Sequence, residues 1–478
     1  MNVILEGESN NRSHPNQLGL WEKIEVSPQG ISRERRNHSA FTSQNSQPLL
    51  AEREQLQQLF EKVFSKANLS QALKRVEANK GAPGVDNMTT DQLRPWLHGN
   101  WPEVLDFLQR GTYRPMPTKM VTIPKASGGM RTLGVPTVLD RLIQQSIAQV
   151  LSPIFEPIFS GSSFGFRPKR SAHQALLRAQ EYINGGHRYT VSIDLENFFD
   201  MVNHDVLMAK VARKITDKKL LKLIRAYLNS GITIDGAIES RTKGTPQGSP
   251  LSPLLSNIML NDLDTELERR GHLFVRYGDD LTVFVKSRRA GERVLTSISK
   301  FIESRLKLKV NQQKSSVGTA QLCVILGYSF YYISKGTVGF RIAQKSNVRL
   351  KHKLRKLTGR SWRISMEDRL TALNLFISGW TNYFSLIQSP KVFKELDQWL
   401  RRRLRQVRWK EWKRPKARFR NLRALGLSRN LATNAAGSGK GSWRLSASQP
   451  LTIAMDNQYW EKLGLQGFEQ CWNRRRLF

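Results

Sequence analysis

Cysteine is nearly absent from this chain, since Cys323 and Cys471 are the only two among 478 residues. This excludes a disulfide framework and any Cys-x-x-Cys zinc site, and it suits a reducing compartment. Long apolar runs are also missing, and the mean hydropathy is −0.46, so we expect no membrane-spanning helix and no membrane partner. Acidic residues are scarce, with 39 Asp and Glu against 76 Lys and Arg and a net charge of +37. We therefore expect a cytoplasmic protein with a polyanionic partner.

An adjacent pair of aspartates, Asp279 and Asp280, stands between strand-forming runs at 273–275 and 281–285. This pattern predicts a β-hairpin with both carboxylates at its turn, where Gly278 permits a tight backbone. Adjacent carboxylates repel each other, and Mg²⁺, which prefers carboxylate oxygens and substrate phosphates, is the usual ion that offsets such charge. An isolated Asp-Asp pair is more often a solvated acidic turn, so a second acidic segment is needed.

That second segment ends a predicted strand. Tyr189, Val191 and Ile193 alternate with polar residues and lead directly to Asp194, the pattern of a short strand with one buried face. If this strand lies beside the hairpin, Asp194 joins Asp279 and Asp280. Two metal ions about 3.5–4 Å apart at such a site clamp the attacking and leaving oxygens of a phosphoryl displacement. The pattern therefore favours in-line phosphoryl transfer.

Short blocks along the chain match those of one family in the same order. They are Asn-Lys-Gly-Ala-Pro-Gly-Val-Asp at 79–86, Tyr-Arg-Pro at 113–115, Ile-Pro-Lys at 123–125, Arg-Thr-Leu-Gly-Val-Pro at 131–136, Ser-Phe-Gly-Phe-Arg-Pro at 163–168, Gly-Thr-Pro-Gln-Gly-Ser-Pro at 244–250, Leu-Gly-Tyr at 326–328 and Gly-Trp-x-x-Tyr-Phe at 379–384. Together with the Asp-Asp hairpin, they make the chain resemble a bacterial group II intron-encoded reverse transcriptase/maturase, or a group II intron-like reverse transcriptase. In this family alanine is usual where Gly278 stands, and we expect glycine there to spare metal binding but to alter packing near the primer end.

The resemblance implies an α+β fold, a right-hand polymerase with a ferredoxin-like palm, helical fingers and thumb, and a small basic C-terminal domain. It also implies catalytic carboxylates at Asp194, Asp279 and Asp280. These three residues, with the backbone carbonyl of Leu195, would bind Mg²⁺, for which Mn²⁺ is a possible substitute.

Five residues are expected to bind the incoming nucleotide. Lys125 and Arg131 flank a hairpin tip, as the family's triphosphate-contacting pair does, and they supply the cationic donors that phosphates need. Phe199 matches the family's steric gate, which excludes a 2′-hydroxyl. Without the resemblance, an ordinary core phenylalanine is an equally good interpretation of this residue. Gln247 and Lys314 are expected near the nucleotide, where an amide and a cation suit its polar groups.

A strongly basic region extends from 345 to 429, with 24 Lys or Arg, 5 Asp or Glu and interleaved tryptophans. Basic side chains neutralise phosphates and aromatic rings stack on unpaired bases. Core packing of the tryptophans and a solvated helix face for the arginines are the alternatives. The expected nucleic-acid contacts are Arg401, Arg402, Arg403, Arg405, Lys410, Lys413 and Arg414.

Domain boundaries follow from composition and motif order. We expect a polar leader at 1–50, an N-terminal extension and fingers at 51–187, a palm at 188–340, a helical thumb or maturase domain at 345–428, and a basic nucleic-acid-binding tail at 429–478. Because Cys471 stands alone there, the paired cysteines of an endonuclease domain are missing, and we expect the endonuclease-free type.

The predicted function is RNA-directed DNA polymerisation, with binding of intron RNA as a splicing maturase and support of intron mobility. The expected partners are an RNA template, intron RNA, a DNA primer or target and deoxynucleoside triphosphates. One alternative is a domesticated group II-like reverse transcriptase that acts in DNA repair or phage defence. Another is a non-catalytic RNA-binding splicing cofactor, which the intact Asp194, Asp279 and Asp280 disfavour. Phe199 and the ordered blocks disfavour a viral RNA-dependent RNA polymerase.

Overall fold

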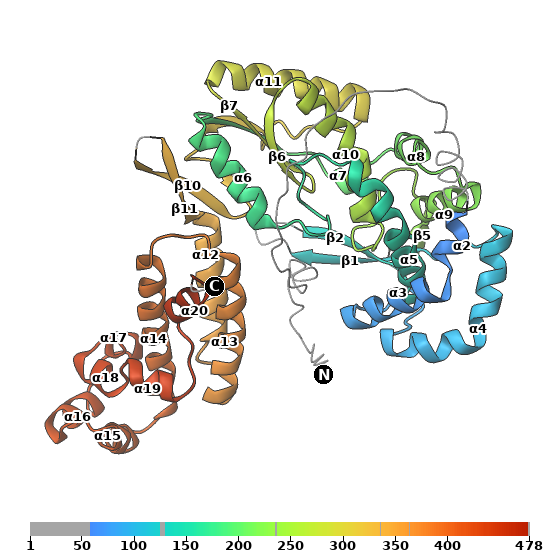
Figure 1. Ribbon diagram of the computed structural model, residues 1–478. Helices are drawn as coiled ribbons and strands as arrows, with labels where there is room; N and C mark the ends of the chain where they lie inside the picture. The colour runs from blue at the N-terminus through green and yellow to red at the C-terminus, as the bar shows by residue number, and fades with distance from the viewer. Residues whose placement is uncertain (1–57, 125–129, 235–236, 335, 363, 477–478) are drawn as a thin grey trace, which may run out of the picture.

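A computed structural model describes residues 58–124, 130–234, 237–334, 336–362 and 364–476. The polar leader expected at 1–50 and the predicted triphosphate contact Lys125 lie outside this range. Figure 1 shows a large mixed part that holds the sheets and a helical part that follows it in sequence.

The palm is a four-stranded antiparallel sheet with the strand order β6-β7-β3-β8. Its elements are β3 (Tyr189–Ile193), α10 (Ser252–Arg269), β6 (Leu273–Tyr277), β7 (Asp280–Val285), α11 (Arg288–Phe301) and β8 (Ser316–Thr319). Strand, helix, two strands, helix and strand in this order form the ferredoxin-like arrangement, which confirms the predicted α+β palm. Val191 and Val283 are fully buried and face one core together with Ile298 of α11.

A second sheet belongs to the fingers and has the order β2-β1-β4-β5. Its strands are β1 (Thr118–Pro124), β2 (Met130–Val135), β4 (Ile232–Ile234) and β5 (Ala237–Glu239). β1 and β2 form the antiparallel hairpin that the sequence predicts, and β1 pairs in parallel with β4. β4 and β5 come from the segment assigned above to the palm, so the fingers sheet draws on both sides of the expected boundary.

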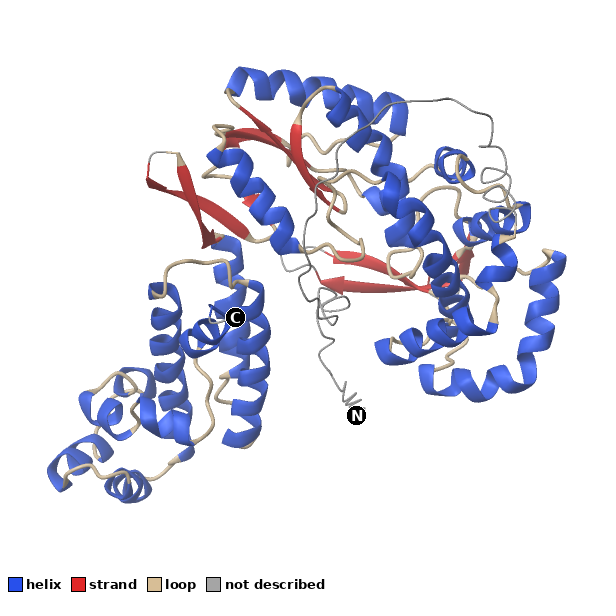
Figure 2. Cartoon of the chain, viewed as in Figure 1, coloured by secondary structure: helices blue, strands red, loops and turns tan. Residues whose placement is uncertain are grey.

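Helices surround these two sheets (Figure 2). They are α2 (Leu59–Val63), α3 (Lys66–Asn79), α4 (Thr90–Arg110), α5 (Val138–Phe155), α6 (Ala172–Asn184), α7 (Phe198–Met201), α8 (His204–Ala212) and α9 (Lys218–Asn229). α2 and α3 are separate helices, because Ser65 caps α3 by accepting a hydrogen bond from the backbone N–H of Asn68. Such a cap satisfies one of the free donors at a helix start.

Beyond the palm, a three-stranded sheet of order β11-β10-β9 leads into a helical region. Its strands are β9 (Val324–Ile325), β10 (Tyr328–Ser334) and β11 (Thr337–Ile342), and the helices are α12 (Gln344–Leu357), α13 (Met366–Tyr383), α14 (Lys391–Glu411), α15 (Pro415–Ala424), α16 (Arg429–Ala436), α17 (Ser442–Leu445), α18 (Gln449–Ala454), α19 (Asn457–Lys462) and α20 (Phe468–Arg476). Tyr328 and Tyr383 join this sheet to α13. The Tyr328 hydroxyl donates to the carbonyl of Tyr383, and the Tyr383 hydroxyl donates to the carbonyl of Leu326, between β9 and β10.

The last helices share one core with the thumb. Phe468 of α20 is fully buried and lies 5.5 Å from the ring of Trp380, edge to face. Trp472 stacks on Phe393 of α14 at 5.2 Å. Trp380 therefore packs against other side chains, which agrees with the core-packing alternative given above for the tryptophans. The boundary expected between residues 428 and 429 does not coincide with a break in the hydrophobic core.

This shared core makes the stability of the thumb depend on α20. Phe468→Ala should remove about 3–5 kcal/mol of stability, the usual cost of truncating a buried Phe, and lower the midpoint of urea unfolding followed by tryptophan fluorescence. Ile453→Ala is the control, because that side chain is 52% exposed. Equal midpoints for the two variants would mean that α20 is only loosely attached.

Candidate active site

The hairpin that carries the aspartate pair forms as predicted. β6 pairs with β7 down to Tyr277 opposite Asp280, so Gly278 and Asp279 make a two-residue turn. Gly278 has a φ of +66°, a conformation that two-residue hairpin turns use and that glycine adopts without strain.

The strand before Asp194 lies directly beside this hairpin. Ile193 of β3 pairs with Leu281 of β7, which places Asp194 and Asp280 at the same end of neighbouring strands. The backbone of Asp194 is held on its other side, because its N–H donates to Ser315 Oγ at 3.0 Å and its carbonyl accepts from Asn311 N at 2.8 Å. The strand therefore lies beside the hairpin, and Asp194 joins Asp279 and Asp280 as expected for that arrangement. An isolated antiparallel β-bridge between Leu195 and Val310 also holds the backbone of the residue after Asp194.

The three carboxylates influence one another electrostatically. Burial of Asp280 and then the charges of Asp279 and Asp194 raise the pKa of the Asp280 carboxyl to about 6. Asp280 is nevertheless an exposed residue, so water reaches a carboxyl that neighbouring protein atoms surround only in part. Lys314 lies beside the cluster, with Nζ 3.9 Å from Asp194 Oδ1. Like charges this close favour a bound cation or a proton.

The donor set suits a hard divalent cation, but it does not form a ready cage. Within the described residues, no group of three or more His, Cys, Asp or Glu side chains is arranged to hold a metal ion by itself. Mg²⁺ commonly binds through one or two carboxylates, waters and substrate phosphates. Carboxylate oxygens at the ends of adjacent strands fit that mode, in which the substrate completes the ion's coordination.

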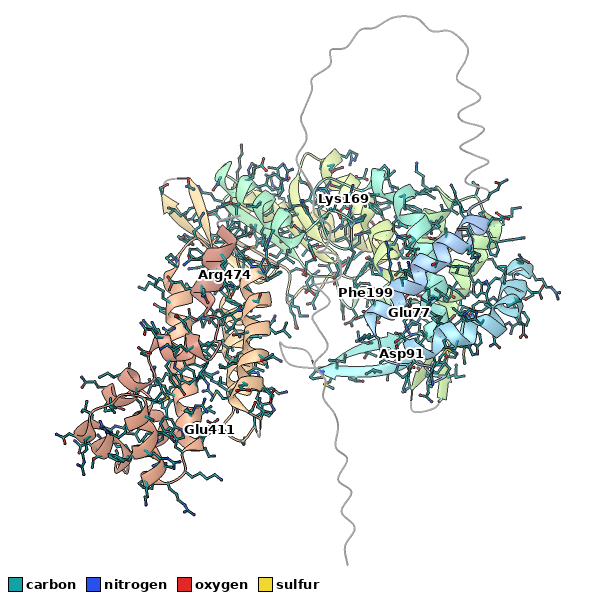
Figure 3. All side chains as sticks on the ribbon, turned by 60° about the horizontal axis from the view of Figure 1, so that its bottom comes forward. Glu77, Asp91, Lys169, Phe199, Glu411 and Arg474 are labelled. Atoms are coloured by element: carbon teal, nitrogen blue, oxygen red, sulfur yellow. The ribbon has the colours of Figure 1, made fainter. Side chains whose placement is uncertain are left out.

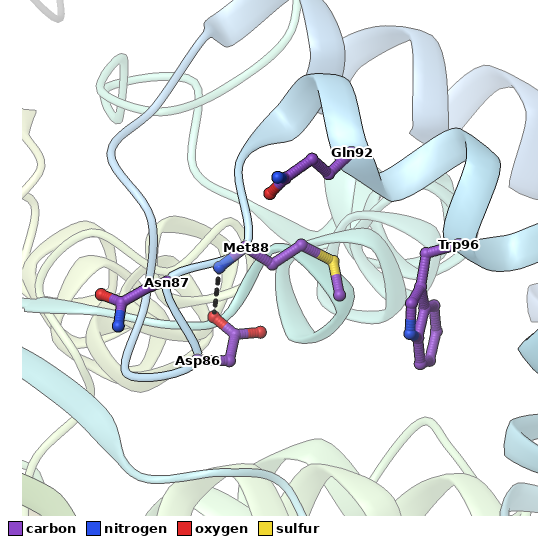
Figure 4. A pocket seen from close by; sticks show the side chains of 5 residues that line it. All are labelled: Asp86, Asn87, Met88, Gln92 and Trp96. Atoms are coloured by element: carbon purple, nitrogen blue, oxygen red, sulfur yellow. Dashed lines mark hydrogen bonds between the residues drawn. The ribbon is translucent and has the colours of Figure 1, made fainter.

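A cavity of about 150 Å³ adjoins the carboxylates. Asp194, Asp280 and Lys314 line it, together with apolar side chains such as Val324 and Ile325 of β9. A shallower hollow of about 430 Å³ lies at the start of α4 and contains none of the three carboxylates. Figure 4 shows its lining residues, Asp86, Asn87, Met88, Gln92 and Trp96.

Three of the predicted nucleotide contacts have described side chains. Phe199, labelled in Figure 3, is half-buried, whereas its neighbour Phe198 is a core residue with 2% of its surface exposed. Gln247 is half-buried, and its carbonyl accepts a hydrogen bond from Gly134 N, which joins its loop to the fingers sheet. Lys314 is the residue beside Asp194. Arg131 contributes its backbone to β2 opposite Ile123.

A buried ion pair that the sequence patterns did not predict lies beneath the turn. Arg276 and Asp264 are both fully buried, with a shortest nitrogen–oxygen distance of 2.5 Å. Arg276 also donates to the carbonyl of Gly278 at 2.8 Å and to Asn257 Oδ1 at 2.9 Å. The signal that could have found it is a charged residue directly after Leu273-Phe274-Val275, inside an apolar strand.

Gly278 is also in close contact with the preceding fingers loop. A Cβ added at Gly278 would lie 2.8 Å from Cε2 of Phe166, and one added at Gly165 would lie 2.2 Å from Gly278 N. The glycine thus affects packing against Phe166. Whether this alters contacts at the primer end stays a prediction.

The predicted nucleic-acid contacts divide into two groups. Arg405 is buried and donates to the carbonyls of Ser446 and Met455, while Arg403 donates to Thr358 Oγ1. Arg402 stacks on Trp443, with its guanidinium carbon 3.9 Å from the ring centre. Arg401 is half-buried. Lys410, Lys413 and Arg414 are exposed. The basic run therefore packs the C-terminal helices as well as carrying surface charge, and we leave Arg405 out of the proposed contact surface.

A ferredoxin-like palm with three carboxylates at one end of its sheet, joined to fingers and a helical thumb, defines a right-hand nucleic-acid polymerase. The reverse transcriptase (RNA-dependent DNA polymerase) family matches residues 123–330, and the maturase-specific domain of group II introns matches residues 348–426. Within the described chain, none of the helices combines the length and apolar composition that crossing a bilayer requires.

Two known proteins are similar to the chain over part of its length. Protein YkfC of Escherichia coli (strain K12) is 30% identical over 302 residues, which is 55% of this chain and 79% of YkfC. The group II intron-encoded protein LtrA of Lactococcus lactis subsp. cremoris is 28% identical over 333 residues, 56% of this chain and 55% of LtrA. This chain belongs to the family of group II intron-type reverse transcriptases/maturases.

The chain therefore spans about half the length of LtrA. Among solved structures, a partial Cas6-RT-Cas1–Cas2 complex is 27% identical over 52% of this chain and 42% of that chain, with a TM-score of 0.34. This score is too low to indicate a shared overall arrangement.

The raised pKa of Asp280 predicts a pH-dependent stability. Between its ordinary pKa of 3.8 and about 6, the folded protein binds more protons at this carboxyl than the unfolded chain does, so stability falls as pH rises through that interval. Asp280→Asn removes the titrating carboxyl and so does not lose stability in this way. The melting temperature of the variant minus that of wild type should increase between pH 4 and 6 in metal-free buffer and stay larger at pH 8. Glu103→Gln on α4 is the exposed control, and a pH-independent difference for Asp280→Asn would contradict the shift.

Proposed function

We propose that this protein is an RNA-directed DNA polymerase that joins deoxynucleoside monophosphates to the 3′-hydroxyl of a primer on an RNA template. The observation that carries the proposal is the placement of Asp194 beside Asp279 and Asp280, at one end of the sheet in the segment that matches reverse transcriptases. Carboxylates at this position suit in-line phosphoryl transfer assisted by divalent metal ions.

Asp194, Asp279 and Asp280, with the carbonyl of Leu195, would hold two Mg²⁺ ions, and Mn²⁺ could replace them. When bound, such ions lower the cost of forming the attacking alkoxide and neutralise charge on the leaving pyrophosphate. Burial, and then repulsion from Asp279 and Asp194, raise the pKa of the Asp280 carboxyl to about 6, so a nearby cation would favour its ionised form.

The chain's other residues would orient the nucleotide. Lys125 and Arg131 are proposed to contact the triphosphate, since each carries a positive charge and, in the sequence, they flank the segment between β1 and β2. Phe199 is proposed as the steric gate that disfavours a ribose 2′-hydroxyl, which agrees with its half-buried position next to Phe198. Gln247 and Lys314 complete the proposed nucleotide site.

We further propose a maturase role, in which the protein binds intron RNA and supports intron mobility in a bacterial cytosol. The match of residues 348–426 to the maturase-specific domain favours this role. The exposed side chains of Lys410, Lys413 and Arg414, with the half-buried Arg401, Arg402 and Arg403, supply cations for RNA phosphates. A domesticated enzyme of DNA repair or phage defence is the second candidate, and the presence of intron RNA domains around the reading frame separates the two.

Asp279→Asn tests the catalytic assignment. The variant should lower primer extension on poly(rA)/oligo(dT) by about 10³-fold, because several kcal/mol of transition-state stabilisation are lost. Binding of the same template–primer should change little, since the basic thumb is unaltered. Extension at the wild-type rate would show that the chemistry takes place elsewhere.

The exposed basic residues should determine how RNA binding depends on salt. Replacing Lys410, Lys413 and Arg414 together by Gln should make the slope of log K against log[salt] shallower by about 0.7–0.9 for each phosphate that the protein no longer neutralises. The matched control replaces the exposed Arg289, Arg293 and Lys300 of α11, which lies across the palm from the thumb (Figure 1). If both triple variants change the slope equally, the binding is not localised to the thumb.

A further inference from the structure

We propose that Arg276, held by Asp264 and Asn257, is a positioning residue that fixes the catalytic turn and thereby sets where the Asp279 and Asp280 carboxylates stand relative to Asp194. The inference rests on the proposed polymerase function and deepens it. It assigns to Arg276 no contact with substrate, only control of the turn that carries two of the acidic groups.

The first support is the geometry of the buried contacts. The Arg276 side chain is fully buried and bidentate on Asp264 of α10, with Nε 2.7 Å from Oδ1 and Nη2 2.5 Å from Oδ2. Its remaining terminal nitrogen, Nη1, donates to the Gly278 carbonyl at 2.8 Å and to Asn257 Oδ1 at 2.9 Å. Since Asp264 and Asn257 both belong to α10, the guanidinium ties the turn to that helix.

The second support comes from the loop on the other side of the turn. Asn257 Nδ2 donates to the Gly165 carbonyl at 2.9 Å. The backbone of Arg276 is bonded to the same loop, because its N–H donates to Ser162 O and its carbonyl accepts from Phe164 N, each at 2.9 Å. A Cβ at Gly165 would lie only 2.2 Å from Gly278 N. The turn is therefore clamped between the loop at 162–165 and the guanidinium.

The third support is energetic. Removing two charges from water costs several kcal/mol for each ion, and buried ion pairs are often no more stabilising than well-packed apolar residues. Stability alone is thus a weak reason for such a pair. A planar guanidinium adds several donors at fixed angles, so it holds Asp264, Asn257 and the Gly278 carbonyl together. A lysine keeps the charge but cannot hold that three-way geometry.

Such control matters because catalysis is sensitive to small displacements. A shift of about 1 Å in a reacting group can cost on the order of 10²-fold in rate. Asp279 follows Gly278 directly, and Asp280 follows Asp279. Loss of the donor to the Gly278 carbonyl therefore releases the peptide that leads into both carboxylates.

The test compares Arg276→Lys with a matched arginine variant, Arg369→Lys. Arg369 is also buried and donates to backbone carbonyls, those of Leu357, Gly359 and Trp362, but it lies in the thumb. Three quantities are measured for each: the melting temperature, the Mn²⁺ affinity of the protein–template–primer complex by electron paramagnetic resonance, and kcat with KM for the nucleotide.

Arg276→Lys should weaken Mn²⁺ binding several-fold and lower kcat by about 10–100-fold, with a smaller change in nucleotide KM. Arg369→Lys should lower the melting temperature while Mn²⁺ affinity stays at the wild-type value. Wild-type Mn²⁺ affinity and kcat in Arg276→Lys would overturn the positioning role, as would equal effects in the two variants. Absence of primer extension by wild type would instead overturn the proposed function.

A second variant covers the case in which Arg276→Lys does not fold. Arg276→Met combined with Asp264→Leu removes both buried charges at once, an exchange that often preserves stability. This double variant should fold and show the same weakened Mn²⁺ binding, since the Gly278 carbonyl again lacks its donor. Wild-type metal affinity in the double variant would overturn the proposal, and failure of both variants to fold would assign the pair to folding instead.

Discussion

Repulsion among three carboxylates at one end of the palm sheet is the constraint around which the rest of the structure is arranged. β3 and β7 are hydrogen-bonded neighbours, so Asp194 and Asp280 cannot separate without breaking the sheet. The pKa of Asp280, raised to about 6 by burial and by the other two carboxylates, records that repulsion. Lys314 offsets part of the charge, and a cation brought with the substrate would offset the remainder. This strongly basic chain thus brings three acidic side chains together where the proposed chemistry needs them.

The turn that brings these charges together has little freedom. Its glycine is at positive φ, and its carbonyl accepts a hydrogen bond from a buried guanidinium. A Cβ at Gly165 would collide with the backbone of Gly278, and one at Gly278 would meet Cε2 of Phe166. Helix α10 supplies the two side chains that hold that guanidinium, Asp264 and Asn257. The thumb follows the palm in sequence, beyond β9–β11. The same palm therefore serves as a rigid support for the acidic site and as the point from which the basic helical region extends.

Much of this arrangement could be predicted from the sequence, because the signals were local. Alternating residues predicted β3, and the turn residues between two apolar runs predicted the β6–β7 hairpin. Features that depend on tertiary contacts could not be predicted in this way. The pairing of β4 with β1 joins segments over 100 residues apart, and the burial of Arg405 depends on carbonyls of Ser446 and Met455 that lie in later helices. Arg276 was missed for the same reason, since its partners Asp264 and Asn257 lie on a different element from the strand that carries it.

The most direct measurement of the central claim is the location of Mn²⁺, by its anomalous scattering, in crystals of the protein with an RNA template, a chain-terminated DNA primer and a deoxynucleoside triphosphate. The account predicts two ions about 3.5–4 Å apart, bound by oxygens of Asp194 and of Asp279 or Asp280 and by the triphosphate. Ions bound elsewhere, or a nucleotide bound with no ion at these carboxylates, would contradict it.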